Sequence, residues 1–97
     1  MRKPLGLMQW TEGTNGADLV AAVRRFENLG YHELWVPEVF GREPFSTCGF
    51  LLAKTERVRI STGIANIYAH DADSAAQAAN GLAELSGGRF TLGLGVS

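Results

Sequence analysis

Short apolar segments alternate along this chain with segments of helical periodicity, and this alternation limits the fold more than any other feature. The segments typical of strands are residues 5–9, 33–36, 58–62 and 90–94, so their starts lie 28, 25 and 32 residues apart. Between them, apolar residues recur at helical spacing over residues 17–29, from Pro44 through Thr55, and over residues 73–85. Parallel strands joined by right-handed helical crossovers produce this rhythm. The sequence therefore predicts an α/β fold with a parallel sheet.

Two architectures have this rhythm, an open doubly wound sheet and the (β/α)8 barrel (TIM barrel). A barrel of ~250 residues uses about 31 residues per unit. The 97 residues of this chain would then supply about three βα units plus a fourth strand, as one partial domain over residues 1–97. Parallel strands need both faces covered, and no helix follows the last strand. We therefore expect the chain to be the N-terminal part of a larger domain.

The ends of the predicted helices carry recognisable signals. Gly30 follows the first helix and the pair Gly87-Gly88 follows the third, in the position that glycine favours at helix C-termini. Ser74 and Gln77 match a capping box, although Asp71 or Asp73 would serve equally well as the N-cap. Residues 63–71 are expected to form a long loop.

Composition excludes several functional classes. The net charge of −1 provides no electrostatic footprint for nucleic acid or for an anionic membrane. Cys48 is the single cysteine, which excludes an internal disulfide and a cysteine-based zinc site; its helical position suggests a core residue. No apolar run approaches the ~20 residues of a membrane span, and no secretory leader is visible. We expect a cytoplasmic protein that acts on a small molecule.

Polar residues gather where the predicted strands end, and both architectures place ligands at these carboxyl ends. Glu38 follows a buried strand, so its carboxylate is a candidate for binding a ligand or for proton transfer. The alternatives are a helix-capping role or a salt bridge, for example with Arg42. His70 with Asp71 is either an oriented imidazole or a loop histidine beside a helix cap. His32 lies at the opposite end of the strands, so the two histidines offer no metal site.

The segment Gly93-Leu94-Gly95 resembles part of a phosphate-binding loop, but the complete G-x-G-x-x-G pattern is missing and three βα units precede it. The alternative is close packing, in which each glycine makes room for a larger neighbour. No Ser-His-Asp spacing or nucleophile elbow is present.

Three longer motifs together resemble the bacterial luciferase-like monooxygenase superfamily, and above all its branch that depends on the deazaflavin coenzyme F420. The motifs are LWVPE at 34–38, TERVRISTGI at 55–64 and LSGGRFTLGLG at 85–95. The resemblance covers nearly the whole chain. It implies a (β/α)8 barrel several times longer than this chain, and a two-electron oxidoreductase that uses reduced F420, or alternatively FMN, at the mouth of the barrel.

The resemblance also implies a set of site residues. Glu38 is expected to be catalytic, as a polar anchor or proton donor near the cofactor ring. Members of the family carry a non-prolyl cis peptide at the end of the third strand, and the matching bond is Gly63–Ile64. The residues expected to line the cofactor are Gly63, Ile64, Ala65, Asn66, Gly95 and Ser97.

Two positions depart from the family pattern. Many relatives have a histidine after the acidic residue of the second strand, and this chain has Val39 there, which argues against a mechanism based on that histidine. Relatives often show His-Pro before the third helix, where this chain has His70-Asp71.

Two other classes of function stay open. The chain is alternatively a non-catalytic, truncated half-barrel that binds a partner or associates with itself through exposed strand edges. A small doubly wound nucleotide-binding domain is disfavoured because no phosphate loop opens the sequence. For the enzyme we expect a homo-oligomer.

Overall fold

The structure is a computed structural model, and it describes residues 5–8, 11–38 and 42–96. It confirms each predicted helix and strand within a few residues. The elements are β1 (Gly6–Met8), α1 (Gly16–Asn28), β2 (Glu33–Val36), α2 (Pro44–Ala53), β3 (Arg59–Thr62), β4 (Ala65–Asn66), α3 (Ala72–Leu85), β5 (Phe90–Thr91) and β6 (Leu94–Gly95). Two details differ from the prediction. The loop over 63–71 contains the short strand β4, and the fourth predicted strand is divided into β5 and β6.

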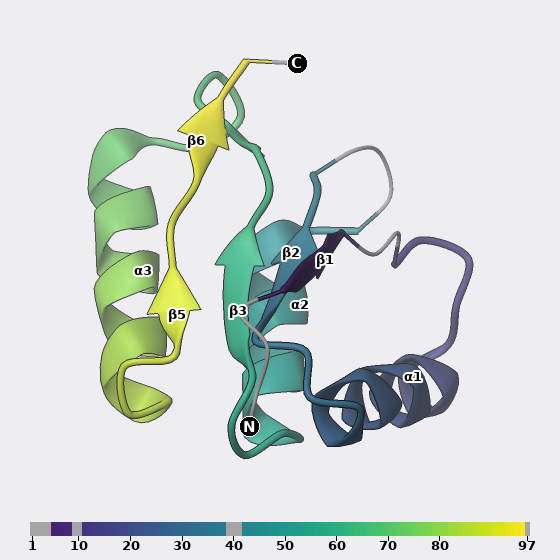
Figure 1. The fold of residues 1–97 in the computed structure, drawn as a ribbon. Coiled ribbons are helices and arrows are strands. Elements are labelled where there is room, and N and C mark those ends of the chain that lie inside the picture. The colour runs from purple at the N-terminus through teal and green to yellow at the C-terminus, as the bar shows by residue number, and fades with distance from the viewer. Residues whose placement is uncertain (1–4, 9–10, 39–41, 97) are drawn as a thin grey trace.

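The strand order separates the two architectures. The main sheet runs β1-β2-β3-β5 with every pair parallel, and β4 pairs with β6 beyond its carboxyl end (Figure 1). A doubly wound sheet reverses its strand order at a switch point, whereas the order here follows the chain throughout the described strands. Right-handed crossovers in this order place all the helices on one face. The doubly wound alternative is therefore wrong, and the topology is that of consecutive barrel units.

The hydrophobic core lies between the sheet and its helices. Leu34, Val36 and Ile60 point from the strands into this core and are at most 1% exposed. The helices supply a matching set of buried residues: Leu19, Val23, Cys48, Leu51 and Leu52. Side chains alternate between the two faces of a strand, so Met8 and Trp35 lie on the helix-free face, where they are 56% and 40% exposed. That face corresponds to the interior of a barrel.

A buried carboxylate braces the amino-terminal end of the sheet. Glu27, near the end of α1, accepts hydrogen bonds through Oε2 from the backbone N–H groups of Glu56, Arg57 and Val58 at 2.9, 2.5 and 2.9 Å. Burial raises the pKa of Glu27, but these three hydrogen bonds and the nearby Arg57 charge outweigh burial and leave the pKa below its ordinary value of 4.5. Glu27 thus holds the turn that leads into β3.

The motif at 86–89 braces the same end. The Ser86 hydroxyl accepts a hydrogen bond from the Arg89 N–H at 3.1 Å, across Gly87 and Gly88, whose φ angles of 70° and 86° favour glycine. The Arg89 guanidinium donates to the carbonyls of Leu52 and Val58 at 2.9 and 3.1 Å. This family motif therefore has a structural role at the end of the sheet opposite the predicted mouth.

Close packing explains the break between β5 and β6. The Thr62 hydroxyl donates to the Gly93 carbonyl at 2.8 Å and accepts from the Gly93 N–H at 2.7 Å. A Cβ on Gly93 would lie 2.3 Å from the Thr62 carbonyl oxygen, and a Cβ on Gly95 would lie 2.8 Å from a methyl carbon of Ile64. Both glycines thus make room for a neighbour, as the close-packing alternative predicted.

None of the described helices is both long enough and apolar enough to cross a membrane.

Replacing Glu27 by Gln should lower the free energy of unfolding by about 1–2 kcal/mol at pH 7, because a neutral amide oxygen accepts hydrogen bonds more weakly than a carboxylate. Folding lowers the pKa of Glu27, so its stabilisation is present above about pH 4.5 and is lost as the pH falls through the folded-state value. Urea denaturation of both proteins at several pH values should show a difference that shrinks below about pH 4.5. Glu56→Gln, at a neighbouring carboxylate that is 83% exposed, is the control; an equal effect there would contradict the assignment.

Replacing Gly93 by Ala should destabilise the protein by about 1–3 kcal/mol, because the new methyl group would overlap the Thr62 carbonyl. Gly81→Ala in α3 is the matched control, since a Cβ there meets nothing within 4 Å and alanine is the better helix former by about 1 kcal/mol. Thermal unfolding should therefore move in opposite directions for the two variants. Equal or inverted shifts would show that Gly93 is not confined by β3.

Candidate functional site

The register of the central strands brings two loops together at the carboxyl end of the sheet. Val36 pairs with Thr62, and one residue later the Gly63 N–H donates to the Val36 carbonyl at 2.7 Å. The segment 37–38 after β2 therefore lies beside the segment 63–66 after β3. The side chain of Glu38 emerges at this junction.

Glu38 forms a hydrogen-bonded pair with His70. Oε1 accepts a hydrogen bond from the Asn66 backbone N–H at 2.8 Å, and Nε2 of His70 lies 2.8 Å from Oε1 and 2.9 Å from Oε2. The side chains of Glu38 and His70 are only 14% and 16% exposed. Glu38 is therefore not a helix cap, and the side-chain partner that the sequence had left open is His70 instead of Arg42.

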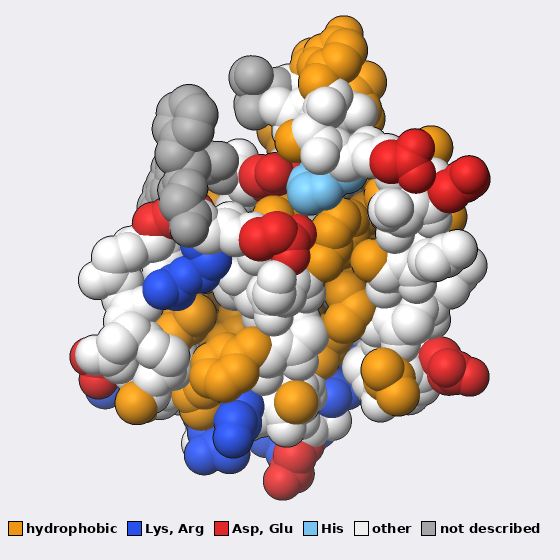
Figure 2. All heavy atoms as spheres, turned by 180° about the vertical axis from the view of Figure 1, so that it is seen from behind, with side chains coloured by type: hydrophobic (Ala, Val, Ile, Leu, Met, Phe, Trp, Pro, Cys, Tyr) orange, Lys and Arg blue, Asp and Glu red, His pale blue; other side chains and the backbone are white. Residues whose placement is uncertain are grey.

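The imidazole of His70 is oriented, although by a different residue from the one considered in the sequence. Asp71 serves as the N-cap of α3, where it accepts the Ser74 N–H at 3.2 Å. The His70 ring meets the ring of Phe45 edge to face, with centroids 5.1 Å apart and an interplanar angle of 80°. Figure 2, which shows the molecule from behind, has acidic side chains next to a histidine in its upper part. The carboxyl ends of parallel strands share one edge of the sheet. A contact between Glu38 and His70 could therefore have been considered from the sequence.

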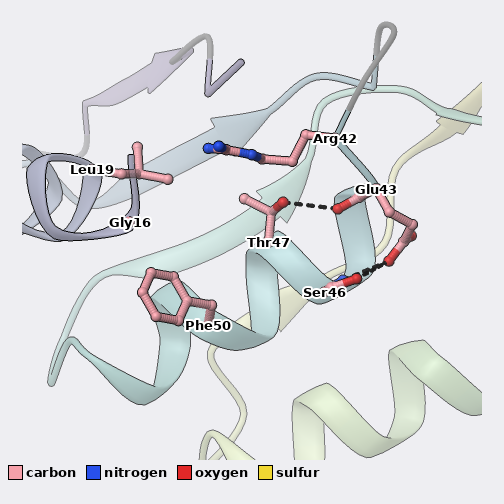
Figure 3. A pocket seen from close by; sticks show the side chains of 7 residues that line it. All are labelled: Gly16, Leu19, Arg42, Glu43, Ser46, Thr47 and Phe50. Atoms are coloured by element: carbon pink, nitrogen blue, oxygen red, sulfur yellow. Dashed lines mark hydrogen bonds between the residues drawn. The ribbon is translucent and has the colours of Figure 1, made fainter. Parts of the chain in front are cut away.

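Arg42 ties the loop after β2 to the loop after β1. Its terminal nitrogens donate to the carbonyls of Thr11 and Thr14 at 2.5 and 2.8 Å. It also borders a pocket of about 270 Å³ between α1 and α2 (Figure 3), lined by Gly16, Leu19, Arg42, Glu43, Ser46, Thr47 and Phe50. Glu43 is the N-cap of α2 and accepts the N–H groups of Phe45 and Ser46. The charged side chains of this pocket, Arg42 and Glu43, are thus already engaged in hydrogen bonds within the protein.

Glu12 is a second carboxylate, in the loop between β1 and α1. Both of its carboxylate oxygens are buried and have no hydrogen-bond partner among the residues that the structure describes. A buried carboxylate without a donor is costly, so Glu12 requires a hydrogen-bond donor that the described residues do not supply. The only sequence signal was the one that identified Glu38, an acidic residue shortly after a strand.

The structure brings together five of the six residues predicted to line a cofactor. Asn66 pairs with Gly95 across β4 and β6, and Ile64 packs against Gly95 and is 40% exposed. Ala65 is fully buried, so its side chain faces the protein. The Asn66 side chain accepts the Tyr68 N–H at 2.8 Å. The sixth predicted residue, Ser97, lies outside the described residues.

The cis peptide predicted at Gly63–Ile64 is wrong for this structure, because the described residues contain no cis peptide bond. In the trans form the backbone is already satisfied, with Gly63 bound to Val36 and the Ala65 N–H donating to the Gly93 carbonyl at 2.8 Å. The absent side chain of Gly63 has its own explanation, since a Cβ would lie 3.3 Å from Met8 and 3.4 Å from Pro37.

Cys48 is not a nucleophile of this site. The thiol is buried in the core, and burial together with the Glu43 charge raises its pKa to about 12. The thiolate required of a reactive cysteine is therefore unfavourable, as expected for a core residue. The part of the chain that the structure describes holds no cluster of three potential metal ligands.

Comparison with known proteins identifies the fold and the family. The luciferase-like monooxygenase family matches residues 5–97. The chain is 37% identical over 83 residues to a protein of Mycobacterium tuberculosis named as a coenzyme F420-dependent oxidoreductase, covering 86% of this chain and 23% of the relative. It is 34% identical over 70 residues to the 5,10-methylenetetrahydromethanopterin reductase of Methanolobus tindarius, covering 71% and 22%.

A solved structure agrees with this assignment. The coenzyme F420-dependent tetrahydromethanopterin reductase of Methanopyrus kandleri superposes with a TM-score of 0.86 at 17% identity, over 97% of this chain and 27% of that protein. At this identity the match bears on the fold alone, which is the N-terminal part of a (β/α)8 barrel. The chain spans about a quarter of the length of these relatives. From its family match and its sequence identities, the chain belongs to the luciferase-like monooxygenase family.

Proposed function

We propose that this chain contributes the first part of a cytoplasmic two-electron oxidoreductase that uses reduced F420, or alternatively FMN, to act on a small-molecule substrate. The family contains oxidoreductases and monooxygenases. The cofactor, when bound, supplies the hydride chemistry, and the protein binds and orients it. Since the chain covers about a quarter of its relatives, activity belongs to the full-length protein.

The observation that carries the proposal is the position of Glu38. Its carboxylate is largely buried, is fixed by Asn66 and His70, and lies at the carboxyl end of parallel strands. In barrels this end holds the reacting groups. Glu38 is placed to anchor a polar group of the ligand or to exchange a proton with it.

The surroundings of Glu38 fit a flat ring with polar edges. Ile64 offers an exposed apolar side chain beside β4, and the segment Gly63, Ile64, Ala65 and Asn66 would form the wall behind the ring. Gly95 and Ser97 would lie next to that wall. F420 is the preferred cofactor because a relative that is 37% identical over 83 residues is named for it.

A specific observation keeps a second function in view. Tyr68, Leu94 and Val96 are 84%, 54% and 58% exposed at the β4–β6 end, and exposed strands and apolar residues favour association. A non-catalytic half-barrel would bind a partner or a second copy there. In the enzyme, the same surface would be covered within the domain or in a homo-oligomer.

Cofactor titration of the full-length protein tests the two functions against each other. Binding of F420 or FMN, followed by the fluorescence of the cofactor, should saturate at one site per chain, with one of the two at least tenfold tighter. Size-exclusion chromatography of the same sample reports association. A protein that associates but binds neither cofactor would be the non-catalytic alternative, and the proposed enzyme would be rejected.

In the full-length protein, Glu38→Gln should reduce turnover about 10²–10⁴-fold, the range expected on losing a group that handles a proton. The thermal midpoint should change little, because the amide is isosteric and its oxygen still accepts the Asn66 N–H. Glu84→Gln, at an exposed glutamate of α3, is the control for the loss of one charge. A large drop in midpoint with unchanged turnover would assign Glu38 to the fold instead.

A further inference from the structure

We propose that His70 positions the Glu38 carboxylate at the mouth, and that the two side chains handle protons there as one unit. The inference rests on the proposed function and extends it, because it moves part of the chemistry from Glu38 to a residue 32 positions later. Its first support is the contact itself. Nε2 of His70 reaches both carboxylate oxygens, at 2.8 and 2.9 Å.

The chemistry of the partners fixes the direction of this hydrogen bond. An ionised carboxylate only accepts hydrogen bonds, so the proton resides on Nε2, and Nδ1 keeps its lone pair in the neutral ring. Oε1 also accepts the Asn66 N–H. With three short contacts on its two oxygens, the Glu38 side chain has little freedom to turn.

The position of the ring is fixed from a second direction. Phe45, on the first turn of α2, meets it edge to face at 5.1 Å. His70 itself follows β4, whose Asn66 binds the same carboxylate. Three separate segments of the chain therefore converge on one imidazole–carboxylate pair, an arrangement that a surface histidine does not require.

The second nitrogen of the His70 ring takes no part in the hydrogen bonds of the described structure. Nδ1 of His70 has no hydrogen-bond partner among the residues that the structure describes. His70 also lines a cavity of about 230 Å³ whose other walls are all apolar: Ile67, Ala72, Ala75, Ala76, Leu92 and Leu94. Among the residues that the structure describes, His70 is thus the one polar side chain lining that cavity, and its Nδ1 is left for a ligand or a water molecule.

Three acidic side chains lie around the ring of His70. Glu38 faces it from the end of β2, Glu43 faces it from the N-cap of α2, and Asp71 adjoins it at the N-cap of α3. All three are carboxylates. A proton that binds Nδ1 converts the neutral imidazole to imidazolium, whose charge the Glu38 carboxylate offsets, and its release restores the starting pair. In hydrolases a carboxylate likewise stabilises the imidazolium that forms beside it.

The first experiment detects the pair without any reaction. In full-length protein with 15N-labelled histidine, signals that vanish in His70→Phe are assigned to His70, and those that vanish in His32→Gln are assigned to the other histidine of this chain. We expect Glu38→Leu to shift the ring nitrogens of His70 and to expose its N–H to solvent exchange. Glu56→Gln, at the opposite end of the sheet, should leave them unchanged. If the ring-nitrogen signals of His70 are the same in Glu38→Leu as in the wild type, the proposal is overturned, whatever the protein catalyses.

The second experiment separates positioning from folding. His70→Phe keeps a ring against Phe45 and removes the donor, so kcat should fall about 10–100-fold, as for a misplaced reacting group, while cofactor affinity stays within threefold. His70→Gln keeps an N–H donor and should recover part of the loss; it also serves if His70→Phe fails to fold. Unchanged kcat in both variants would make the pair purely structural and overturn this inference, while cofactor binding would leave the proposed function standing. If wild-type protein reacts with neither cofactor, both proposals are rejected.

Discussion

The register of β3 between β2 and β5 is the constraint on which the rest of the structure depends. Parallel pairing holds Ile60 beside Leu34 on one side and beside Phe90 on the other, and all three side chains enter the core. A slip of β3 by one residue would turn its own side chains, Ile60 among them, to the opposite face of the sheet. The same register sets Gly63 against Val36, which places Glu38 next to Asn66. The hydrophobic pattern of the strands thus determines where the polar groups of the mouth meet.

The two ends of the sheet use polar side chains differently. At the amino-terminal end, Glu27 and Arg89 direct their charges at backbone N–H and carbonyl groups, and these contacts tie the turns and helix ends together. At the carboxyl end, Glu38 and His70 bind mainly each other, and Glu12 has no partner in the described part of the chain. A buried polar group without a hydrogen-bond partner lowers the stability of the fold. This cost agrees with the ligand site proposed at the carboxyl end of the sheet.

Much of the fold followed from the sequence, because periodicity and glycine positions are local signals. The strand over 33–36 and the helix end at Gly87-Gly88 appear where the pattern indicated. The division of the last strand did not follow, since it depends on the Thr62 hydroxyl, which is 31 residues from Gly93. Glu38 was identified from its place after a strand. Its partner was missed because neighbouring Asp71 offered a local explanation for His70, whereas the actual contact depends on how two loops fold over one sheet edge.

The glycines at the carboxyl end of the sheet are weaker evidence for a bound cofactor ring than their positions in the sequence suggest. Gly63 is confined by Met8 and Pro37, Gly93 by the Thr62 carbonyl, and Gly95 by Ile64. Gly93 is required by packing alone, because a Cβ there would meet a backbone carbonyl, whereas Gly63 and Gly95 have the side chains of Met8 and Ile64 among their neighbours. Packing does not explain a carboxylate held by an imidazole whose second nitrogen is unpartnered in the described structure. The case for chemistry at this end of the sheet therefore rests on Glu38 and His70, and the glycines explain why the surrounding strands can approach closely enough to bring that pair together.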